Sequence, residues 1–307
     1  MFDVLILGSG PAGLSAAIYA SRANLNYEVI EVEDHGAGQI TGTSVVDNYP
    51  GFPKISGYEL GESLRKHALS LGAVFCKGEV TSIEKEDCLS SGKPFYKVFL
   101  NGDTDNPLES KTVLYSFGAE HIHLGIPGEE KLIGAGICFC SVCDGPFFKD
   151  LHVAVIGGGN SALGDALHLS TLANKVYLIH RRDTFRASAS IVESVKKTPN
   201  IELVLNTIPA EFEGEDELEA IKMVDGRRIE VQGAFEAVGM RPRTELIKHL
   251  VPLDKKGYVI ADETGITSIP GFFVAGDVRT KALRQVITAA ADGAGAIQSI
   301  TEYLQNS

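Results

Sequence analysis

Cys140 and Cys143 form a C-x-x-C pair whose spacing suits redox chemistry. Only a short loop separates the two cysteines, so a disulfide between them can close and open easily. Asp144 follows directly and could donate a proton to a leaving thiolate, although Asp144-Gly145-Pro146 is also ordinary turn sequence. We predict a redox-active dithiol with Cys140, Cys143 and Asp144 as its catalytic residues.

A zinc site is the main alternative for a C-x-x-C pair. Such a site needs a second pair of ligands, and neither Cys76, Cys88 nor the scattered histidines offer C-x-x-C or H-x-x-x-H spacing. We therefore expect no metal. Cys138 precedes the pair by two residues and is expected to be packed rather than reactive, because free cysteines are commonly buried.

A glycine-rich turn connects the apolar run 4–7 to a helix-like segment. Its G-x-G-x-x-G pattern lets backbone N–H groups and a helix N-terminus approach a pyrophosphate. Glu31 ends the next strand-like run, where a carboxylate can accept a hydrogen bond from an adenosine ribose. The residues expected to bind this first dinucleotide are Gly8, Gly10, Pro11, Ala12, Gly13 and Glu31.

A second turn of the same kind follows the apolar run 153–156. At the position equivalent to Glu31 it is followed by arginines, which suit the extra 2′-phosphate of NADP, although a solvated basic face would look similar. The residues expected to bind NADPH are Gly157, Gly159, Asn160, Ser161, Ala162, His180, Arg181, Arg182 and Arg186. Two nucleotide turns and one dithiol indicate electrons passing from one cofactor through another to a disulfide.

The composition narrows the class of protein. A chain of 307 residues is long enough for two domains, and a formal net charge of −12 argues against a nucleic-acid partner. The apolar run 4–7 is too short for a signal peptide, and no run approaches the roughly 18 apolar residues of a membrane span. Five cysteines, three of them within 138–143, do not resemble a secreted disulfide framework. We expect a cytoplasmic protein with no membrane partner.

Strands and helices alternate in two similar units, which is typical of an α/β fold with two Rossmann-like dinucleotide-binding domains and parallel sheets. The first unit is expected to have strands at 4–7, 29–32, around 74–84 and 95–100, and helices after Gly13 and at 57–71. We expect the run 111–117 to cross into the second unit as a strand. That unit should have strands at 153–156 and 176–179 and helices from about 160 and 187, before a buried strand at 271–277 and a helix at 284–304.

Ordered motifs over essentially the whole chain resemble the low-molecular-weight, bacterial-type thioredoxin reductases of the pyridine nucleotide-disulfide oxidoreductase family. The matching segments are 8–13, 38–39, 47–51, 140–145, 157–162, 180–187, 275–278, 283–286 and 288–290. The resemblance implies an FAD-binding domain formed by residues 1–114 and 246–307, an inserted NADPH-binding domain of residues 115–245 that carries the dithiol, and a homodimer.

The same resemblance implies further contacts with FAD. Asp277 would contact the ribityl-phosphate region of the flavin, and Asp144 would be the proton donor to the dithiol. The other residues expected around FAD are Gln39, Asn48, Val80, Gly276, Arg284, Gln285 and Val286.

Three segments depart from the usual sequence of that family. Residues 116–123 replace Ala-Thr-Gly-Ala and a later Arg, Gly164-Asp165 replaces two glutamates, and Arg241-Pro242-Arg243 stands where Pro-Asn is usual. The domain junction and details of the NADPH domain are expected to differ accordingly.

The sequence therefore predicts an NADPH-dependent flavoprotein that passes electrons through FAD and Cys140/Cys143 to a protein disulfide, with thioredoxin as the expected partner. A related enzyme that takes electrons from ferredoxin, or passes them to oxygen, would not need the intact nicotinamide site. A non-catalytic flavin or nucleotide sensor, or a ferredoxin reductase of similar fold, would not need the paired cysteines.

Overall fold

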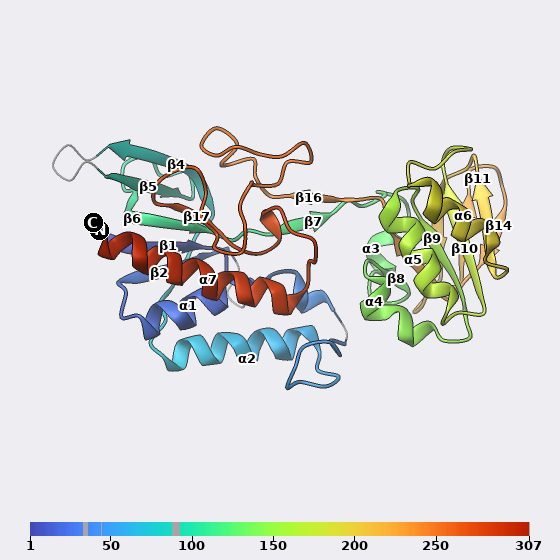
Figure 1. Cartoon of the computed structure of the whole chain (residues 1–307). Helices are drawn as coiled ribbons and strands as arrows, with labels where there is room; N and C mark the ends of the chain where they lie inside the picture. The colour runs from blue at the N-terminus through green and yellow to red at the C-terminus, as the bar shows by residue number, and fades with distance from the viewer. Residues whose placement is uncertain (33–35, 44, 88–92, 307) are drawn as a thin grey trace. The chain divides into compact units, whose positions relative to one another are not determined.

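The computed structural model describes residues 1–32, 36–43, 45–87 and 93–306, and the chain forms two compact units (Figure 1). Unit 1 contains Met1–Glu120 and Arg241–Ser307, and unit 2, His121–Met240, is inserted between them. The boundaries expected from the sequence placed residues 115–120 and 241–245 in the inserted unit. They pack with unit 1 instead, because Tyr115 is buried in its core and its hydroxyl donates to the Arg243 carbonyl at 2.7 Å.

Unit 1 is built on a seven-stranded sheet in the order β3-β2-β1-β6-β5-β4, with β17 also paired to β6. Its strands are β1 (Phe2–Leu7), β2 (Tyr27–Glu31), β3 (Phe75–Lys77), β4 (Val80–Asp87), β5 (Pro94–Leu100), β6 (Leu108–Tyr115) and β17 (Phe272–Val274). Strands β3, β2, β1, β6 and β17 pair in parallel, whereas β5 runs antiparallel to both β6 and β4. The parallel part therefore has the strand–turn–helix arrangement of a nucleotide-binding fold.

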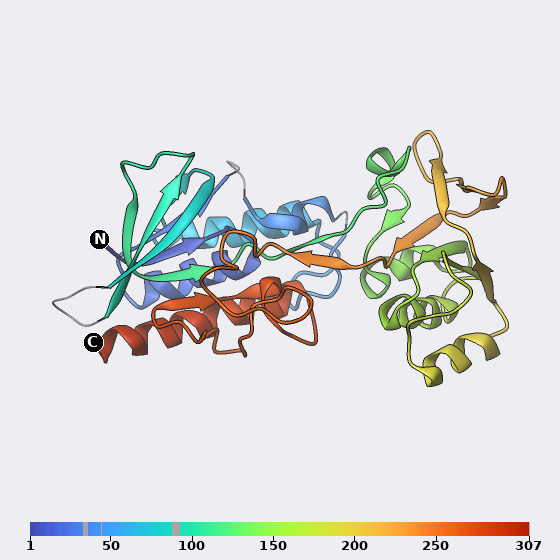
Figure 2. The ribbon, with the colours of Figure 1, turned by 90° about the horizontal axis from the view of Figure 1, so that it is seen from above.

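Helices α1 (Pro11–Arg22) and α7 (Val286–Gln305) lie side by side on one face of this sheet, next to α2 (Gly57–Ser70) (Figures 1 and 2). Small residues allow the close approach, since a Cβ on Gly293 would lie 2.0 Å from the Ala12 carbonyl oxygen. A capping box of Ser56 and Glu59 begins α2. Two short 3₁₀ helices lie in the chain before these helices: η1 (Gly38–Gly42) precedes α2, and η3 (Gly276–Val278) precedes α7.

The chain passes between the units along two short strands, β7 (Ala119–His121) and β16 (Met240–Pro242), which pair with each other. The expectation that residues 111–117 cross into unit 2 is wrong. Most of that run belongs to β6, whose apolar residues are buried between β1 on one side and β5 and β17 on the other. A central strand and a crossing strand have the same apolar sequence signal, so periodicity alone could not separate them.

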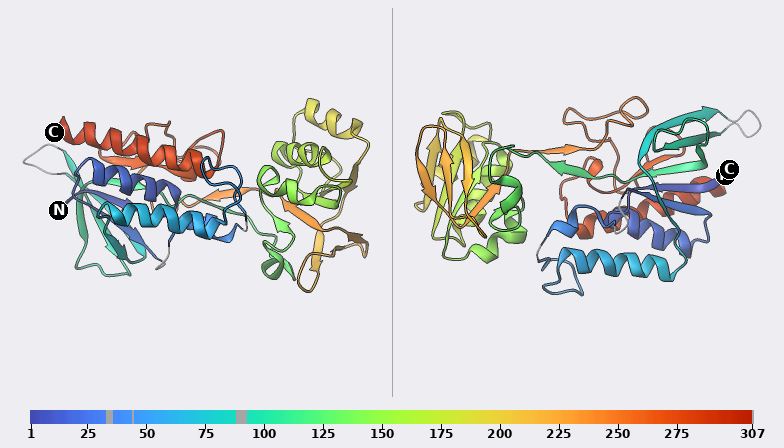
Figure 3. Two further views of the ribbon diagram at one scale, coloured as in Figure 1. Left: turned by 90° about the horizontal axis from the view of Figure 1, so that it is seen from below. Right: turned by 180° about the vertical axis from the view of Figure 1, so that it is seen from behind.

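Unit 2 contains a five-stranded parallel sheet in the order β11-β10-β9-β15-β8. Its strands are β8 (Ile137–Cys138), β9 (His152–Ile156), β10 (Lys175–His180), β11 (Ile201–Leu205) and β15 (Gly233–Glu236). Helices α5 (Asn160–Ser170) and α6 (Ala189–Lys197) pack on one face, and the antiparallel strands β12 (Pro209–Glu213), β13 (Ala220–Met223) and β14 (Arg228–Glu230) cover the other (Figure 3). The short elements α3 (Glu129–Leu132), α4 (Ser141–Asp144) and η2 (Gly145–Phe148) precede β9 in the chain.

The predicted fold class is confirmed, because each unit has a parallel sheet and a glycine turn between its first long strand and the helix that follows. The second unit is formed by a segment that interrupts the first unit in sequence. Within the described ranges, no helix is long and apolar enough to cross a membrane.

Candidate active site

The dithiol of unit 2 follows β8 in the chain, and its loop packs against α5. Cys140 and Cys143 form a disulfide with their Cα atoms 5.3 Å apart. Cys140 caps the short helix α4, and its Sγ accepts a hydrogen bond from the Cys143 backbone N–H at 3.2 Å. A backbone N–H directed at sulfur stabilises a thiolate more than a thiol, so Cys140 is the sulfur that this loop prepares to carry negative charge.

Asp144 follows this pair directly and is largely buried. Burial raises the pKa of Asp144 to about 6, against hydrogen bonds to its carboxyl from the Cys140 backbone and the Cys138 thiol. A carboxylic acid with this pKa can be protonated in a useful fraction of molecules near neutral pH. The structure thus brings together all three residues that the sequence predicted to be catalytic.

Cys138 is the third cysteine of the segment, and its thiol is held in the neutral form. Burial and the Asp144 carboxyl raise the pKa of Cys138 far above its usual range. Because the thiolate is the nucleophile, a thiol that resists ionisation is unreactive. The expectation that Cys138 is packed agrees with its contacts in the core of unit 2, whereas its link to Asp144 was not foreseen.

Ser141 and Asp165 form a hydrogen bond at the dithiol loop that the cysteine motif did not predict. The Ser141 hydroxyl, buried inside the dithiol loop, donates to Asp165 Oδ1 at 2.5 Å. Asp165 lies in α5, and burial raises the pKa of its carboxyl, opposed by the bond from Ser141. Its only sequence signal was the unusual Gly164-Asp165 pair, which the structure now connects to the dithiol.

The first glycine turn, in unit 1, is shaped to receive a ligand. Gly8 has φ +103°, and a Cβ on Gly13 would lie 1.8 Å from the Gly8 carbonyl oxygen, so both positions require glycine. A Cβ on Gly10 would have no atom within 4 Å, which leaves the turn open beside the N-terminus of α1. Pro11 is the first residue of that helix, and Ala12, the second, is buried.

Glu31 ends β2 beside this turn, because β2 pairs in parallel with β1. Its buried carboxylate accepts two hydrogen bonds from Arg65, at 2.6 and 2.7 Å. Each carboxylate oxygen has a second lone pair, so Arg65 fixes the carboxylate and still leaves acceptor capacity for a ribose hydroxyl. The sequence had not identified Arg65.

The C-terminal part of unit 1 has buried polar atoms that lack a hydrogen-bond partner among the described residues. Asp277 Oδ1 and Arg284 Nε are both buried and make no hydrogen bond to any residue in the described ranges. Burial raises the pKa of Asp277, and Lys281, 3.6 Å away, opposes that shift. Buried polar groups are normally satisfied, so an acceptor and a donor left open here fit the polar groups of a bound flavin nucleotide.

The remaining residues expected around FAD come from several elements. Asn48 donates to the Gln285 side chain at 2.9 Å, which joins two residues far apart in the sequence. Gln285 caps α7, and Val286 is the first residue of that helix. The last three are Gln39 in η1, Gly276 in η3, and Val80, whose side chain is buried in the core of unit 1.

The second glycine turn, in unit 2, joins β9 to α5 and also has an open side. A Cβ on Gly159 would have no atom within 4 Å, whereas one on Gly158 would lie 2.1 Å from the His180 ring. His180 ends β10, is buried, and stacks on Phe185 with ring centroids 5.3 Å apart. Burial lowers the pKa of His180, which favours its neutral form.

Three arginines follow His180 and are exposed around the second turn. Arg186 donates its backbone N–H to the Gly158 carbonyl at 2.8 Å, which ties this loop to the turn. Across the residues that the structure covers, Arg181, Arg182 and Arg186 form no ion pair with an acid. Unpaired guanidinium groups beside an open glycine turn fit a ligand that carries an additional phosphate.

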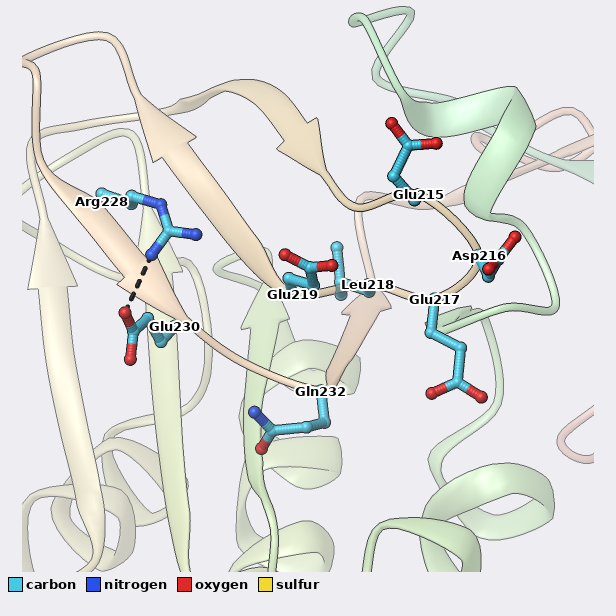
Figure 4. A pocket seen from close by; sticks show the side chains of 8 residues that line it. All are labelled: Glu215, Asp216, Glu217, Leu218, Glu219, Arg228, Glu230 and Gln232. Carbon is cyan, nitrogen blue, oxygen red and sulfur yellow. Dashed lines mark hydrogen bonds and ion pairs between the residues drawn. The ribbon is translucent and has the colours of Figure 1, made fainter.

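Figure 4 shows a hollow of about 680 Å³ elsewhere in unit 2, formed by the loop before β13 and by β14. Its lining is mainly acidic and consists of Glu215, Asp216, Glu217, Leu218, Glu219, Arg228, Glu230 and Gln232. Arg228 is already paired with Glu230 at 2.9 Å. A hollow with this charge repels phosphate groups and is therefore not a nucleotide site.

Two segments with unusual sequence, residues 116–123 and 241–243, meet at the connecting strands β7 and β16. Glu120 in β7 accepts hydrogen bonds from both Arg241 and Arg243, and the bonds from Arg241 hold the pKa of Glu120 below its usual range. The acid on one strand and the two arginines on the other therefore compensate each other.

Comparison with known proteins identifies relatives of nearly the same length. Residues 2–293 match the family model described as pyridine nucleotide-disulphide oxidoreductase. The chain is 41% identical to a thioredoxin reductase of Treponema pallidum, over 99% of this chain and 97% of that one, and 37% identical to one of Listeria innocua, over 99% and 94%. A crystal structure of thioredoxin reductase from Streptococcus pyogenes superposes with a TM-score of 0.91 at 37% identity, covering 100% of this chain and 99% of that chain.

Proposed function

Because the chain belongs to the thioredoxin reductases of the pyridine nucleotide-disulphide oxidoreductase family, we propose that it reduces the disulfide of a thioredoxin with electrons from NADPH. The observation that carries this proposal is the Cys140–Cys143 disulfide beside an aspartic acid whose pKa is raised to about 6. A nucleotide-binding turn in the same unit supports it.

The two glycine turns divide the cofactors between the units. In unit 1, the turn from Gly8 to Gly13, Glu31 and the open polar atoms of Asp277 and Arg284 would hold FAD. In unit 2, the second turn and its arginines would hold NADPH. When bound, these cofactors supply two electrons as a hydride equivalent and pass them on to sulfur.

The residues of the dithiol carry out the exchange with the partner. The Cys140–Cys143 disulfide takes up two electrons and two protons and becomes two thiols. The Cys140 thiolate, stabilised by the Cys143 N–H, attacks one sulfur of the partner disulfide, and Asp144 protonates the thiolate that leaves. Cys143 then attacks Cys140, which re-forms the enzyme disulfide and releases the second partner thiol.

An anaerobic titration tests this function. NADPH should bleach the flavin absorbance of the purified protein, and an oxidised thioredoxin should restore it while gaining two thiols per disulfide. Bleaching without thiol formation in any of several thioredoxins would show that the acceptor is another protein. No bleaching by NADPH would show that the electron donor is different.

The second candidate, a related enzyme supplied by ferredoxin or coupled to oxygen, is disfavoured by the second turn. Such an enzyme has no use for Arg181, Arg182 and Arg186, which surround that turn without acidic partners among the residues covered by the structure. The dithiol likewise disfavours a nucleotide sensor.

We also propose a cytoplasmic homodimer. Large apolar side chains are exposed on the helices of unit 1, including Tyr19 in α1 and Tyr58 and Leu69 in α2, and burying them would stabilise a pair of chains. A cytoplasmic location fits a dithiol that must be returned to its reduced form, because that compartment keeps thiols reduced. Light scattering of the FAD-loaded protein measures the oligomeric state, and a monomeric mass would contradict the dimer.

A further inference from the structure

Three side chains that can bind a metal ion meet in unit 2. None of them belongs to the cysteine motif or to the glycine turn. One ligand atom each from His123, Glu129 and Glu236 lies within 4.8 Å of the other two. Glu236 is the last residue of β15, and Glu129 is the first residue of α3. Because Glu236 is more than 100 residues from His123 and Glu129 in the sequence, no spacing motif predicts the group.

Glu236 is the unusual member, because its carboxylate is buried without a donor. The residue is 3% exposed and ends a central strand on the face that carries the apolar side chains of Ala234 and Ile156. Neither oxygen receives a hydrogen bond from any residue in the described ranges. A buried carboxylate without a partner is costly, so a charge or donor that satisfies it is expected.

Glu129 is the acid beside Glu236, and burial together with the Glu129 carboxylate raises the pKa of Glu236 to about 8. Its Oε2 accepts two backbone N–H bonds and its Oε1 accepts one, all from residues 124–126, at 2.6 to 3.2 Å. Oε1 also lies 3.0 Å from His123 Nδ1. A carboxylate offers about four lone-pair sites. These contacts keep the Glu129 carboxylate ionised beside Glu236, because together they hold its pKa below the usual range.

We propose that His123 Nδ1, Glu129 Oε1 and the Glu236 carboxylate bind a divalent transition-metal ion of the Zn²⁺ type. One imidazole nitrogen and two carboxylate oxygens are ligands that zinc accepts, at about 2.0–2.2 Å. The 3.0 Å between Nδ1 and Oε1 is close to the separation of two ligands on one such ion.

The ion satisfies each group at little cost elsewhere. It replaces only the contact between His123 and Glu129, and the three backbone bonds to Glu129 remain. Its charge of about +2 balances two carboxylates and a neutral imidazole. The His123 side chain is 52% exposed, so an ion can enter from solvent and keep water in its remaining positions. The site would tie the segment before α3 to the end of β15.

The test uses the complete FAD-loaded enzyme in its oxidised form, because a closed Cys140–Cys143 disulfide does not compete for zinc. After treatment with a chelator, Zn²⁺ is titrated by calorimetry and the melting temperature is measured with and without the ion. The variants are Glu236→Gln, which keeps the shape of the side chain, and His123→Ala, at an exposed position. The exposed His67 in α2 provides the control, His67→Ala.

We expect one Zn²⁺ per chain at this site, a higher melting temperature with the ion, and binding at least tenfold weaker in Glu236→Gln and in His123→Ala but unchanged in His67→Ala. Equal affinity in all four proteins would place the ion elsewhere and overturn the proposal. The absence of binding in the wild type would also overturn it and would mean that Glu236 is held as a neutral acid. If Glu236→Gln fails to fold, His123→Ala decides.

Discussion

At the scale of single residues, we expect the Asp144 carboxyl to control proton transfer at the dithiol. Its pKa is raised to about 6, so the acid form that can donate is present below pH 6 and is lost as the pH rises through that value. Asp144→Asn should slow reduction of thioredoxin by pre-reduced enzyme by about tenfold to a thousandfold, the range of general acid catalysis. In the wild type, the rate of thioredoxin reduction should fall above pH 6, and Asp144→Asn should remove this fall.

Stopped-flow measurements between pH 5 and 8 check this, with Asp150→Asn, an exposed position of the same unit, as the control. A wild-type rate that does not change between pH 5 and 8 would rule out Asp144 as the donor. The same pH dependence in the wild type and in Asp144→Asn would also rule it out.

The hydrogen bond between Ser141 and Asp165 allows a second prediction for single residues. Ser141→Ala leaves the Asp165 carboxyl buried beside an apolar group, which should lower the free energy of unfolding by about 1–3 kcal/mol. Asp165→Asn keeps an acceptor for the hydroxyl and should cost less. Urea unfolding of the two variants makes the comparison, and an unchanged midpoint in Ser141→Ala would show that the hydroxyl is not needed.

At the scale of elements, opposite charges at the ends of β2 and β10 distinguish the two nucleotide sites. Glu31 ends β2, whereas Arg181 and Arg182 follow β10. Removing both arginines should weaken binding of NADPH by about ten- to hundredfold for each charged hydrogen bond lost, since such a bond contributes about 1.5–3 kcal/mol. Binding of NADH should be spared. Binding titrations with both nucleotides test this, and equal losses would refute a role in recognising the 2′-phosphate.

The paired strands β7 and β16 carry the exposed cluster of Glu120, Arg241 and Arg243. Exposed ion pairs contribute little, so Glu120→Gln should lower the free energy of unfolding by less than about 1 kcal/mol, and the difference should vanish in high salt. Because the pKa of Glu120 is lowered, the contribution is present at neutral pH and is lost as the pH falls through the lowered value. A salt-independent loss would mean that packing, not charge, is responsible.

Local signals explain why some elements were predictable from sequence and others were not. The glycine turns and the cysteine pair each lie within six consecutive residues, so their chemistry is visible in the chain. Asp165, Arg65 and Glu236 acquire their roles from partners in other elements, which no spacing rule contains. The run 111–117 was wrongly expected to cross between the units, because a buried central strand looks the same in sequence.

For the whole molecule, the two half-reactions are expected to depend on different residues, although the second glycine turn and the dithiol lie in the same inserted unit. Reduction of the flavin by NADPH requires the two glycine turns and no sulfur, whereas reduction of a partner disulfide requires Cys140 and Cys143 together. Variants of the cysteines should therefore separate the halves without affecting FAD binding.

The most direct test is to compare the wild type with Cys140→Ser and Cys143→Ser in anaerobic NADPH titration followed by addition of oxidised thioredoxin. All three proteins should bind FAD and be bleached by NADPH, and only the wild type should form two thiols per thioredoxin disulfide. Full thioredoxin reduction by either serine variant would contradict the pathway through Cys140 and Cys143, and would direct attention to Cys138.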